Sequence, residues 1–381
     1  MAGDTTDILI FVEDPGAANS IVDLPGALAN RGLKAATVAA GHARPYLAQL
    51  GSRFAEADDR EGAAALLDAH RPRLVLAGTS ENPDTLGLKL IAEARRRGVA
   101  SVGFVDGPAS AEYRFRGRGA NPLGFAPDRL LVPEDFTRRR FLKLGLAADR
   151  VVECGYPYYD RVRAEGRNLA RIGQTAIRAR VLPEAPAPAP GGRPVIAFLA
   201  EVSEGLIPGG FQRGDDYTLA GRGGSDRRTD IVLEEVLDAL AAVRPRPYLV
   251  LRMHPKNRES EFAAYRREID FVSQGGAALE TAFAADLVIG MTTILLFEAA
   301  IISRAALSVV PRPIEAEWLT GVGLGVVPAV HDRAALRNIL PAAVADPARI
   351  MGTPAEKVIQ FGALDRMADF LAGLVAGGGW S

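Results

Sequence analysis

Short apolar runs alternate with segments of helical periodicity along most of the chain. Each run has the length of a buried strand, and several end at glycine, proline or a charged residue. Strands are expected at residues 7–13, 33–40, 73–79, 100–105, 128–133, 150–155, 194–201, 248–253, 285–290, 305–311 and around 326–327. Helices are expected at residues 20–30, 134–144, 168–180, 229–243, 259–267, 294–302, 333–345 and 354–375, with another ending near 98. This alternation predicts an α/β protein whose mostly parallel sheets are covered on both faces.

A segment rich in proline and alanine divides the chain into two comparable halves. Residues 183–194 alternate proline with alanine and then carry two glycines, a composition that cannot hold a packed element. We therefore expect one α/β domain at 1–182, a second at 195–352 and a helical tail at 353–381. With 381 residues, of which 48% are hydrophobic, the chain is long enough for two cores.

Charge and cysteine content narrow the functional class. The 45 basic and 46 acidic side chains leave a net charge of −1, which argues against nucleic-acid binding through broad phosphate attraction. The single cysteine, Cys154, excludes an internal disulfide and any metal site built from several cysteines. The four histidines lack metal-ligand spacing, so no metal is expected. Because neither a signal peptide nor a membrane-spanning run is apparent, we expect a cytoplasmic protein.

Polar stretches interrupt the pattern at three places. Residues 113–119, with Arg129 just beyond them, carry four arginines and are expected to form a surface loop that is either solvated or meets an anionic acceptor. Residues 202–228 contain many glycines, and loops of this length are usually functional or mobile. The arginines at 138–140 suit either peripheral contact with the inner face of a membrane or a solubilising role.

In the second half, strand 248–253 ends in a titratable ring and two cations. Arg252, His254 and Lys256 would lie at the carboxyl edge of a parallel sheet, where open α/β sheets bind ligands. His254 is either a structural histidine or a donor to a phosphate or leaving group, helped by the two cations. Glu201 ends the first strand of the same half and is expected among the substrate-binding residues.

The helix expected at 294–302 begins after two hydroxyls and carries one carboxylate. Thr292 and Thr293 would cap it, and its free N–H groups and positive dipole end favour phosphate, although capping alone is the alternative. Glu298 lies in an otherwise apolar helix, where a buried carboxylate needs a partner. A ribose diol would serve, and so would an internal arginine or a backbone donor.

In the first half, carboxylates follow several strands and should meet at one sheet edge. Asp106 and Asp14 are the candidates for a general base, and Glu81 competes with them for that role or binds substrate. Capping the helix that follows is the alternative role for each of them. Gly16, in a loop expected at 14–19, would allow the backbone to approach a substrate.

Together these motifs resemble the nucleotide half of GT-B enzymes. His254-Pro255 is similar to the His-Pro motif of CDP-glycerol glycerophosphotransferases and bacterial polysialyltransferases. Thr292-Thr293 followed by Glu298 is similar to the helix start of non-hydrolysing UDP-N-acetylglucosamine 2-epimerases. Residues 155–160, Gly-Tyr-Pro-Tyr-Tyr-Asp, look like the Gly-x-Pro-x-x-Asp that closes the first domain in both groups. Asp106, with the residues that follow it, also resembles a segment of surface-polysaccharide biosynthesis proteins.

The resemblance implies two Rossmann-like domains facing across a cleft, with the acceptor in the first and the nucleotide in the second. It implies that His254 contacts the donor phosphate, that Thr292 and Thr293 contact the diphosphate, and that Glu298 contacts the ribose. The Ser-Gly-Gly of the epimerases is here Thr293-Ile294-Leu295, which closes the backbone approach that those glycines permit.

We therefore expect a metal-independent glycosyltransferase of surface-polysaccharide or glycoconjugate assembly. Its substrates would be a nucleotide-sugar and a hydroxyl acceptor, which is a saccharide, a lipid-linked molecule or a protein. No cofactor is expected. A sugar-nucleotide epimerase or hydrolase, a glycerophosphotransferase, and a non-catalytic nucleotide-binding scaffold on a GT-B frame are the alternatives.

Overall fold

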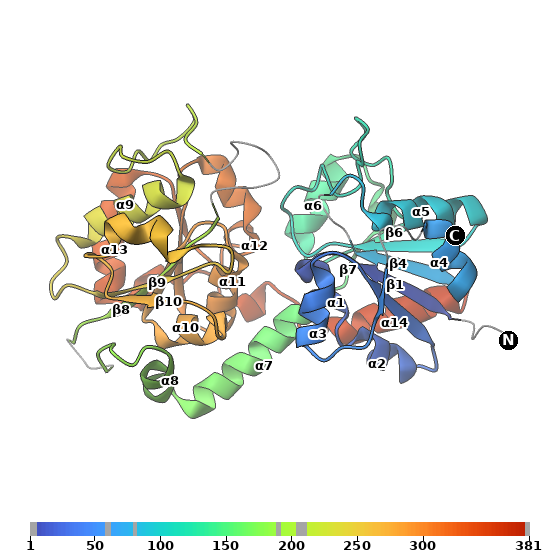
Figure 1. The fold of residues 1–381 in the computed structure, drawn as a ribbon, viewed down its shortest axis with the longest axis horizontal. Coiled ribbons are helices and arrows are strands. Elements are labelled where there is room, and N and C mark those ends of the chain that lie inside the picture. The colour runs from blue at the N-terminus through green and yellow to red at the C-terminus, as the bar shows by residue number, and fades with distance from the viewer. Residues whose placement is uncertain (1–5, 58–61, 79–81, 188–191, 203–211, 378–381) are drawn as a thin grey trace. The chain divides into compact units, whose positions relative to one another are not determined.

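The computed structural model describes residues 6–57, 62–78, 82–187, 192–202 and 212–377. Two compact units are present (Figure 1). The first comprises the chain up to Asp160 together with the residues from Ile359 onward, and the second comprises Arg161–Val358. The division therefore falls earlier than the expected linker at 183–194, part of which lies outside the described residues, and the expected tail is shared between the units.

The first unit is built on a parallel sheet. Among its described residues the strand order is β3-β2-β1-β4-β5-β6-β7, and every pair of neighbours is parallel. The strands are β1 (Ile8–Val12), β2 (Ala35–Ala39), β3 (Ala55–Glu56), β4 (Leu74–Gly78), β5 (Ala100–Phe104), β6 (Arg129–Val132) and β7 (Val151–Glu153). This is a Rossmann-like order, in which the winding reverses between β1 and β4.

Helices cover both faces of this sheet because its strands are buried on both sides. Ile8, Ile10 and Val12 pack toward one group of helices, whereas Leu9 and Phe11 pack toward the other. The first group is α1 (Pro15–Ile21), α2 (Leu24–Ala29), α3 (Ala43–Gln49) and α14 (Ala363–Val375). The second group is α4 (Ala63–His70), α5 (Leu86–Arg97) and α6 (Asp135–Lys143). The sheet is thus the middle of three layers.

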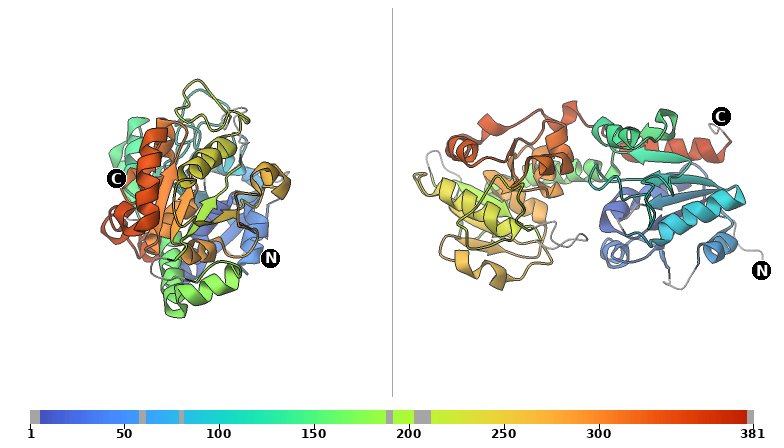
Figure 2. Two further views of the ribbon diagram at one scale, coloured as in Figure 1. Left: turned by 90° about the vertical axis from the view of Figure 1, so that its left-hand side faces the viewer. Right: turned by 90° about the horizontal axis from the view of Figure 1, so that it is seen from above.

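The helix α14 belongs to the first unit although it follows the whole of the second unit in the sequence. It lies along the first sheet beside α2 (Figure 1, Figure 2). Asp160 fixes its start, since its carboxylate accepts the backbone N–H of Gly362 at 2.7 Å and of Ala363 at 2.9 Å. The aspartate of the Gly-x-Pro-x-x-Asp segment is therefore a cap for α14.

The second unit contains another parallel sheet of Rossmann-like order. Among its described residues the order is β10-β9-β8-β11-β12-β13, with the reversal between β8 and β11. The strands are β8 (Val195–Leu199), β9 (Tyr248–Arg252), β10 (Phe271–Ser273), β11 (Leu287–Gly290), β12 (Ala305–Val309) and β13 (Ala329–Val330).

Helices also surround the second sheet. One apolar cluster joins β8, β9, β11 and β12 to α9 (Arg228–Leu240) and α13 (Arg333–Ala345). The remaining α-helices are α7 (Pro157–Ile172), α8 (Gln174–Val181), α10 (Ala278–Ala284), α11 (Ile294–Ile301) and α12 (Thr320–Gly323). Short 3-10 helices lie at Glu259–Tyr265, Pro313–Trp318, Pro347–Ile350 and Ala355–Lys357 in this unit, and at Ala148–Arg150 in the first unit. α10 contacts β8, and α11 contacts β11 and β12.

One expectation from the sequence is wrong, and another is met only in part. The loop expected at 14–19 is helical, because α1 begins at Pro15, whose fixed φ and missing N–H suit the first turn of a helix. The stretch 113–119 is irregular and exposes Arg118, as expected, but Phe115 is fully buried and packs edge-on against Phe141 with 6.0 Å between ring centroids, so only part of the stretch lies at the surface.

The arginines at 138–140 lie on α6, where two of them pair with carboxylates. Arg138 lies 3.7 Å from Glu153 and Arg139 lies 2.9 Å from Asp135. Within the described residues, no helix is both long and apolar enough to cross a membrane.

Candidate functional site

The carboxyl edge of the second sheet collects most of the side chains expected to bind substrate. Glu201 follows β8, His254 follows β9, and Met291, Thr292 and Thr293 follow β11. β8 and β11 are the neighbours between which the winding reverses, so Glu201 and the threonines flank the point where such sheets open a crevice.

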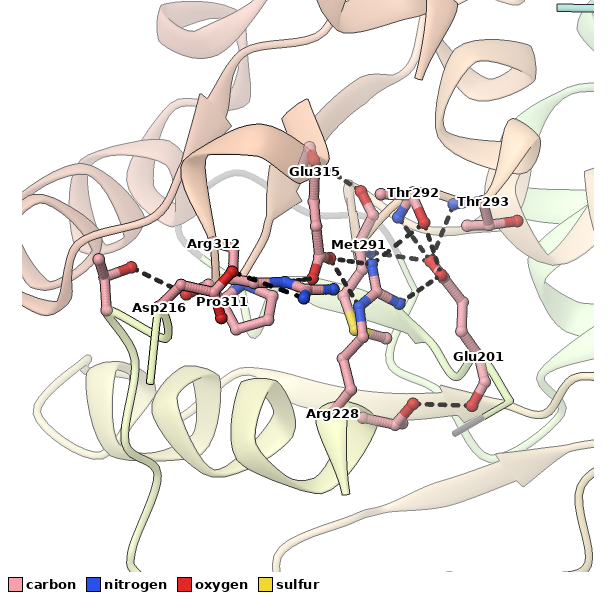
Figure 3. Close-up of polar contacts among 12 residues, drawn as sticks. Glu201, Asp216, Arg228, Met291, Thr292, Thr293, Pro311, Arg312 and Glu315 are labelled. Atoms are coloured by element: carbon pink, nitrogen blue, oxygen red, sulfur yellow. Dashed lines mark hydrogen bonds and ion pairs between the residues drawn. The ribbon is translucent and has the colours of Figure 1, made fainter. Parts of the chain in front are cut away.

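The Glu201 carboxylate occupies the start of α11 (Figure 3). Its Oε1 accepts the backbone N–H groups of Met291 at 3.1 Å, Thr292 at 2.7 Å and Thr293 at 2.8 Å. Its Oε2 accepts the hydroxyl of Thr292 at 3.0 Å. Thr293 caps α11, as the sequence predicts, because its hydroxyl accepts the N–H of Leu295. An internal anion thus binds the backbone N–H groups that lead from β11 into α11, the last of them that of the N-cap residue Thr293.

Arg228, the first residue of α9, joins Glu201 to a second buried carboxylate. Its guanidinium donates to Glu201 Oε2 at 2.9 Å, to Glu315 Oε2 at 2.6 Å and to Thr292 Oγ1 at 3.1 Å. Glu315 also accepts from Arg312 at 2.7 Å. The side chain of Arg228 is 1% exposed and that of Glu315 is 0% exposed. Asp216 lies 3.6 Å from Arg312 at the exposed end of this network, so the two guanidiniums face three carboxylates and the network carries no net positive charge (Figure 3).

The network sets the charge state of Glu201. Burial raises the pKa of this carboxyl, but the charge and hydrogen bonds of Arg228 and the N–H groups at the helix start outweigh burial, so the pKa lies below its usual value. Burial likewise lowers the pKa of Arg228, and the two carboxylates outweigh it, so that pKa is raised. Both groups are charged at neutral pH.

His254 presents one ring nitrogen as a donor. Its Nδ1 accepts the backbone N–H of Lys256 at 3.1 Å, and its own backbone N–H donates to Asn257 Oδ1 at 3.0 Å. With Nδ1 engaged as an acceptor, the proton of the neutral ring resides on Nε2. Burial, followed by the charge of Lys256, lowers the pKa of His254 against an opposing effect of Glu201. The ring is therefore neutral at pH 7 and donates through Nε2.

The remaining predicted residues of this half have different surroundings. Lys256 is exposed beside His254. Arg252 is buried and donates to Ser273 Oγ at 3.0 Å and to the carbonyls of Gly275 and Gly276, so its guanidinium holds the turn after β10. Glu298 is buried on α11 with 5% of its surface exposed. Their contacts with a substrate stay predictions.

In the first unit, Asp106 lies against the start of α1. Arg114 donates to Asp106 Oδ1 at 3.1 Å, and the Asp106 side chain remains 31% exposed. A Cβ at residue 16 would overlap Asp106 Oδ2, so Gly16 is what lets this carboxylate approach the helix. The buried Tyr156 hydroxyl donates to the carbonyl of Gly16 at 2.9 Å, and burial raises its pKa.

The other carboxylates expected at this edge have different surroundings. Asp14 occupies the N-cap position of α1, but its side chain makes no capping hydrogen bond. Glu13, beside it, accepts from Asn82 at 3.0 Å and from the hydroxyl of Thr85, the residue that caps α5. Glu81 lies outside the described residues.

Solved structures share this architecture over nearly the whole chain. MnaA of Staphylococcus aureus, solved with UDP, is 14% identical, with a TM-score of 0.65 over 98% of this chain and 97% of that one. The UDP-GlcNAc 2-epimerase of Methanocaldococcus jannaschii, solved with UDP-GlcNAc and UDP, is 12% identical, with a TM-score of 0.63 over 96% and 99%. A glycosyltransferase of Rickettsia africae is 9% identical, with a TM-score of 0.60 over 98% and 99%.

The chain has a GT-B-like fold. No family model matches the sequence, and no curated protein matches it either. The resemblance of the His-Pro motif to glycerophosphotransferases and polysialyltransferases stays a prediction.

Arg228 and Glu315, the two buried residues at the centre of the charged network, were not predicted from the sequence. Arg228 and Glu315 lie far apart in the sequence and outside any motif, yet their guanidinium and carboxylate meet at 2.5 Å. One feature of the sequence could have indicated Arg228: it begins the helix α9, where the helix dipole disfavours a cation. Such a residue implies a carboxylate partner, which here is Glu201.

Proposed function

We propose that this protein is a glycosyltransferase that moves a sugar from a nucleotide-sugar donor to a hydroxyl acceptor in surface-polysaccharide or glycoconjugate assembly. The observation that carries the proposal is the likeness, over nearly the whole chain, to GT-B proteins solved with UDP or UDP-GlcNAc. The His254 donor at the carboxyl end of β9 supports it, because a leaving phosphate needs fixed donors.

In the second unit, the donor would be held by groups that meet its phosphate and ribose. The Nε2–H of His254 would donate to a phosphate oxygen, and the exposed ammonium of Lys256 would balance its charge. Glu298 would accept hydrogen bonds from the ribose hydroxyls. These roles combine the observed surroundings of each side chain with the family resemblance of its motif.

In the first unit, Asp106 would act as the general base. It would take the proton of the acceptor hydroxyl as that oxygen bonds to the anomeric carbon and the bond between this carbon and the phosphate oxygen breaks. Arg114 and the neighbouring Gly16 fix the position of the carboxylate, and its partial exposure leaves one side open to an acceptor. Asp14 is the alternative base.

A sugar-nucleotide 2-epimerase is the second candidate, because several of the similar structures carry that name. The segment Thr293-Ile294-Leu295 argues against an epimerase, since Ile294 and Leu295 replace the two glycines of the epimerase motif. The two activities have different products. An epimerase converts free nucleotide-sugar without an acceptor, whereas a transferase releases nucleotide only when an acceptor is present.

The test uses UDP-, CDP-, GDP-, dTDP- and CMP-sugars, each with and without a mixture of oligosaccharide acceptors, followed by NMR. We expect nucleotide release that depends on acceptor in the wild type, and a loss of at least about 100-fold in His254→Ala. His70→Ala is the matched control, since His70 is the last residue of α4 in the first unit and lies outside the proposed donor site. Turnover by His254→Ala at the wild-type rate would refute the assignment, and conversion without acceptor would establish the epimerase.

A further inference from the structure

The connection from β11 to α11 is where an α/β unit of this kind would bind a phosphate, and here the Glu201 carboxylate occupies that position. Three successive N–H groups converge on Glu201 Oε1 within 3.1 Å. They belong to Met291, Thr292 and the N-cap Thr293, in the connection from β11 to α11. In α/β nucleotide sites, N–H groups of such a strand-to-helix connection, with the helix dipole behind them, bind a phosphate of the ligand. A phosphate and the Glu201 carboxylate cannot both occupy that position.

Displacing Glu201 is unfavourable because its second oxygen is engaged as well. Oε2 accepts from Arg228 at 2.9 Å and from the Thr292 hydroxyl at 3.0 Å, and the side chain is only 13% exposed. Its backbone carbonyl is also held, since it accepts the hydroxyl of Thr229 at 2.7 Å. A ligand that pushed the carboxylate away would leave the buried Arg228 with one carboxylate partner fewer.

The charges around the remaining space favour one phosphate over two. Arg228 and Arg312 are balanced by Glu201 and Glu315 within the network, so they contribute no net positive charge. Arg252 is committed to the carbonyls of Gly275 and Gly276. At this edge, the exposed ammonium of Lys256 and the Nε2–H of His254 suit a single phosphate group.

We propose that Glu201 is a specificity-determining residue that excludes a second phosphate, so that this site selects a nucleoside monophosphate-linked sugar over a nucleoside diphosphate-linked one. The proposal rests on the function proposed above and names its donor class. It departs from the expectation that Thr292 and Thr293 contact a diphosphate, because their N–H groups bind Glu201 instead. The single phosphodiester would lie against His254 and Lys256.

Calorimetry with paired ligands tests this directly. The affinities of CMP, UMP and GMP are compared with those of CDP, UDP and GDP for the wild type and two variants. Glu201→Ala removes the side chain from the start of α11, whereas Glu201→Gln keeps a side chain of the same size without its charge. Glu315→Gln is the matched control, because it removes a carboxylate from the same arginine without touching the start of α11. Thermal unfolding identifies variants that are folded.

The readout is the ratio of monophosphate to diphosphate affinity for the base that binds. We expect the wild type to bind the monophosphate at least as tightly as the diphosphate. Glu201→Ala should shift the affinity ratio toward the diphosphate by about tenfold or more, and Glu315→Gln should leave the ratio unchanged. A smaller shift in the same direction is expected for Glu201→Gln. A wild type that prefers the diphosphate, with a ratio unmoved by Glu201→Ala, would overturn this inference alone. No binding of any nucleotide would overturn the proposed function with it.

Discussion

Replacing Arg228 with methionine should destabilise the second unit strongly, and the loss should depend on pH. The side chain is 1% exposed and holds two carboxylates, so its removal leaves Glu201 and Glu315 buried without their shared cation. Breaking a buried ion pair in this way costs about 3–5 kcal/mol of unfolding free energy. Arg222 supplies the control: it also binds two carboxylates, but its side chain is 37% exposed, so Arg222→Met should cost no more than about 1 kcal/mol.

The sign of the pH dependence follows from Glu201. In the wild type its pKa is depressed, so its contribution to stability is present above the ordinary glutamate pKa of about 4.3 and is lost as pH falls through the depressed value. Without Arg228, the main group that lowers the pKa is gone and burial raises it. Protonation at lower pH then relieves the unpaired charge. The difference in unfolding free energy should therefore be large at pH 8 and smaller at pH 5.

Urea unfolding followed by tryptophan fluorescence measures this difference. The chain has two tryptophans, and Trp318 lies next to the network, with the Arg312 guanidinium 5.4 Å from its ring centroid. In a Trp380→Phe background, Trp318 alone reports unfolding of the second unit. A difference below about 1 kcal/mol at pH 8, or an equal difference at pH 5 and pH 8, would refute the claim that Arg228 neutralises a buried carboxylate.

Two further predictions concern the first unit. Asp160→Ala removes the cap of α14 and should cost about 1–2 kcal/mol, seen as faster amide hydrogen exchange in α14; unchanged exchange there would contradict the capping role. Cys154 is buried and its pKa is raised to about 12, so it should resist iodoacetamide at pH 8 in the folded protein and react once urea unfolds it; equal rates in both states would show that the thiol is accessible.

Residue patterns predicted most of the architecture because the strands are buried on both faces and appear as continuous apolar runs. The expected strands appear in the predicted order and form two Rossmann-like sheets, whereas the helices α3, α4 and α10 were not predicted and α7 begins earlier than expected. Short elements such as β3 and β10 were missed, because two or three residues carry no readable period.

The candidate site was predictable only in its strand-end residues. Parallel strands deliver their carboxyl ends to one edge, which is why the neighbourhood of His254, Thr292 and Glu201 follows from the sequence alone. Which side chain binds which atom does not follow. Arg252 turns away to backbone carbonyls, and Glu201 binds the helix start that was expected to receive phosphate. Both outcomes depend on packing between segments that are distant in the sequence.

The placement of α14 has a consequence for synthesis on the ribosome. The first unit has its sheet complete after β7, yet the helical cover of one face, which α1, α2 and α3 begin, is completed only when residues 363–375 emerge. By then the whole of Arg161–Val358 has left the ribosome and is able to fold. The N-terminal unit is therefore the later of the two to be completed, and until α14 docks it exposes apolar surface, including that of α2, that a chaperone would recognise.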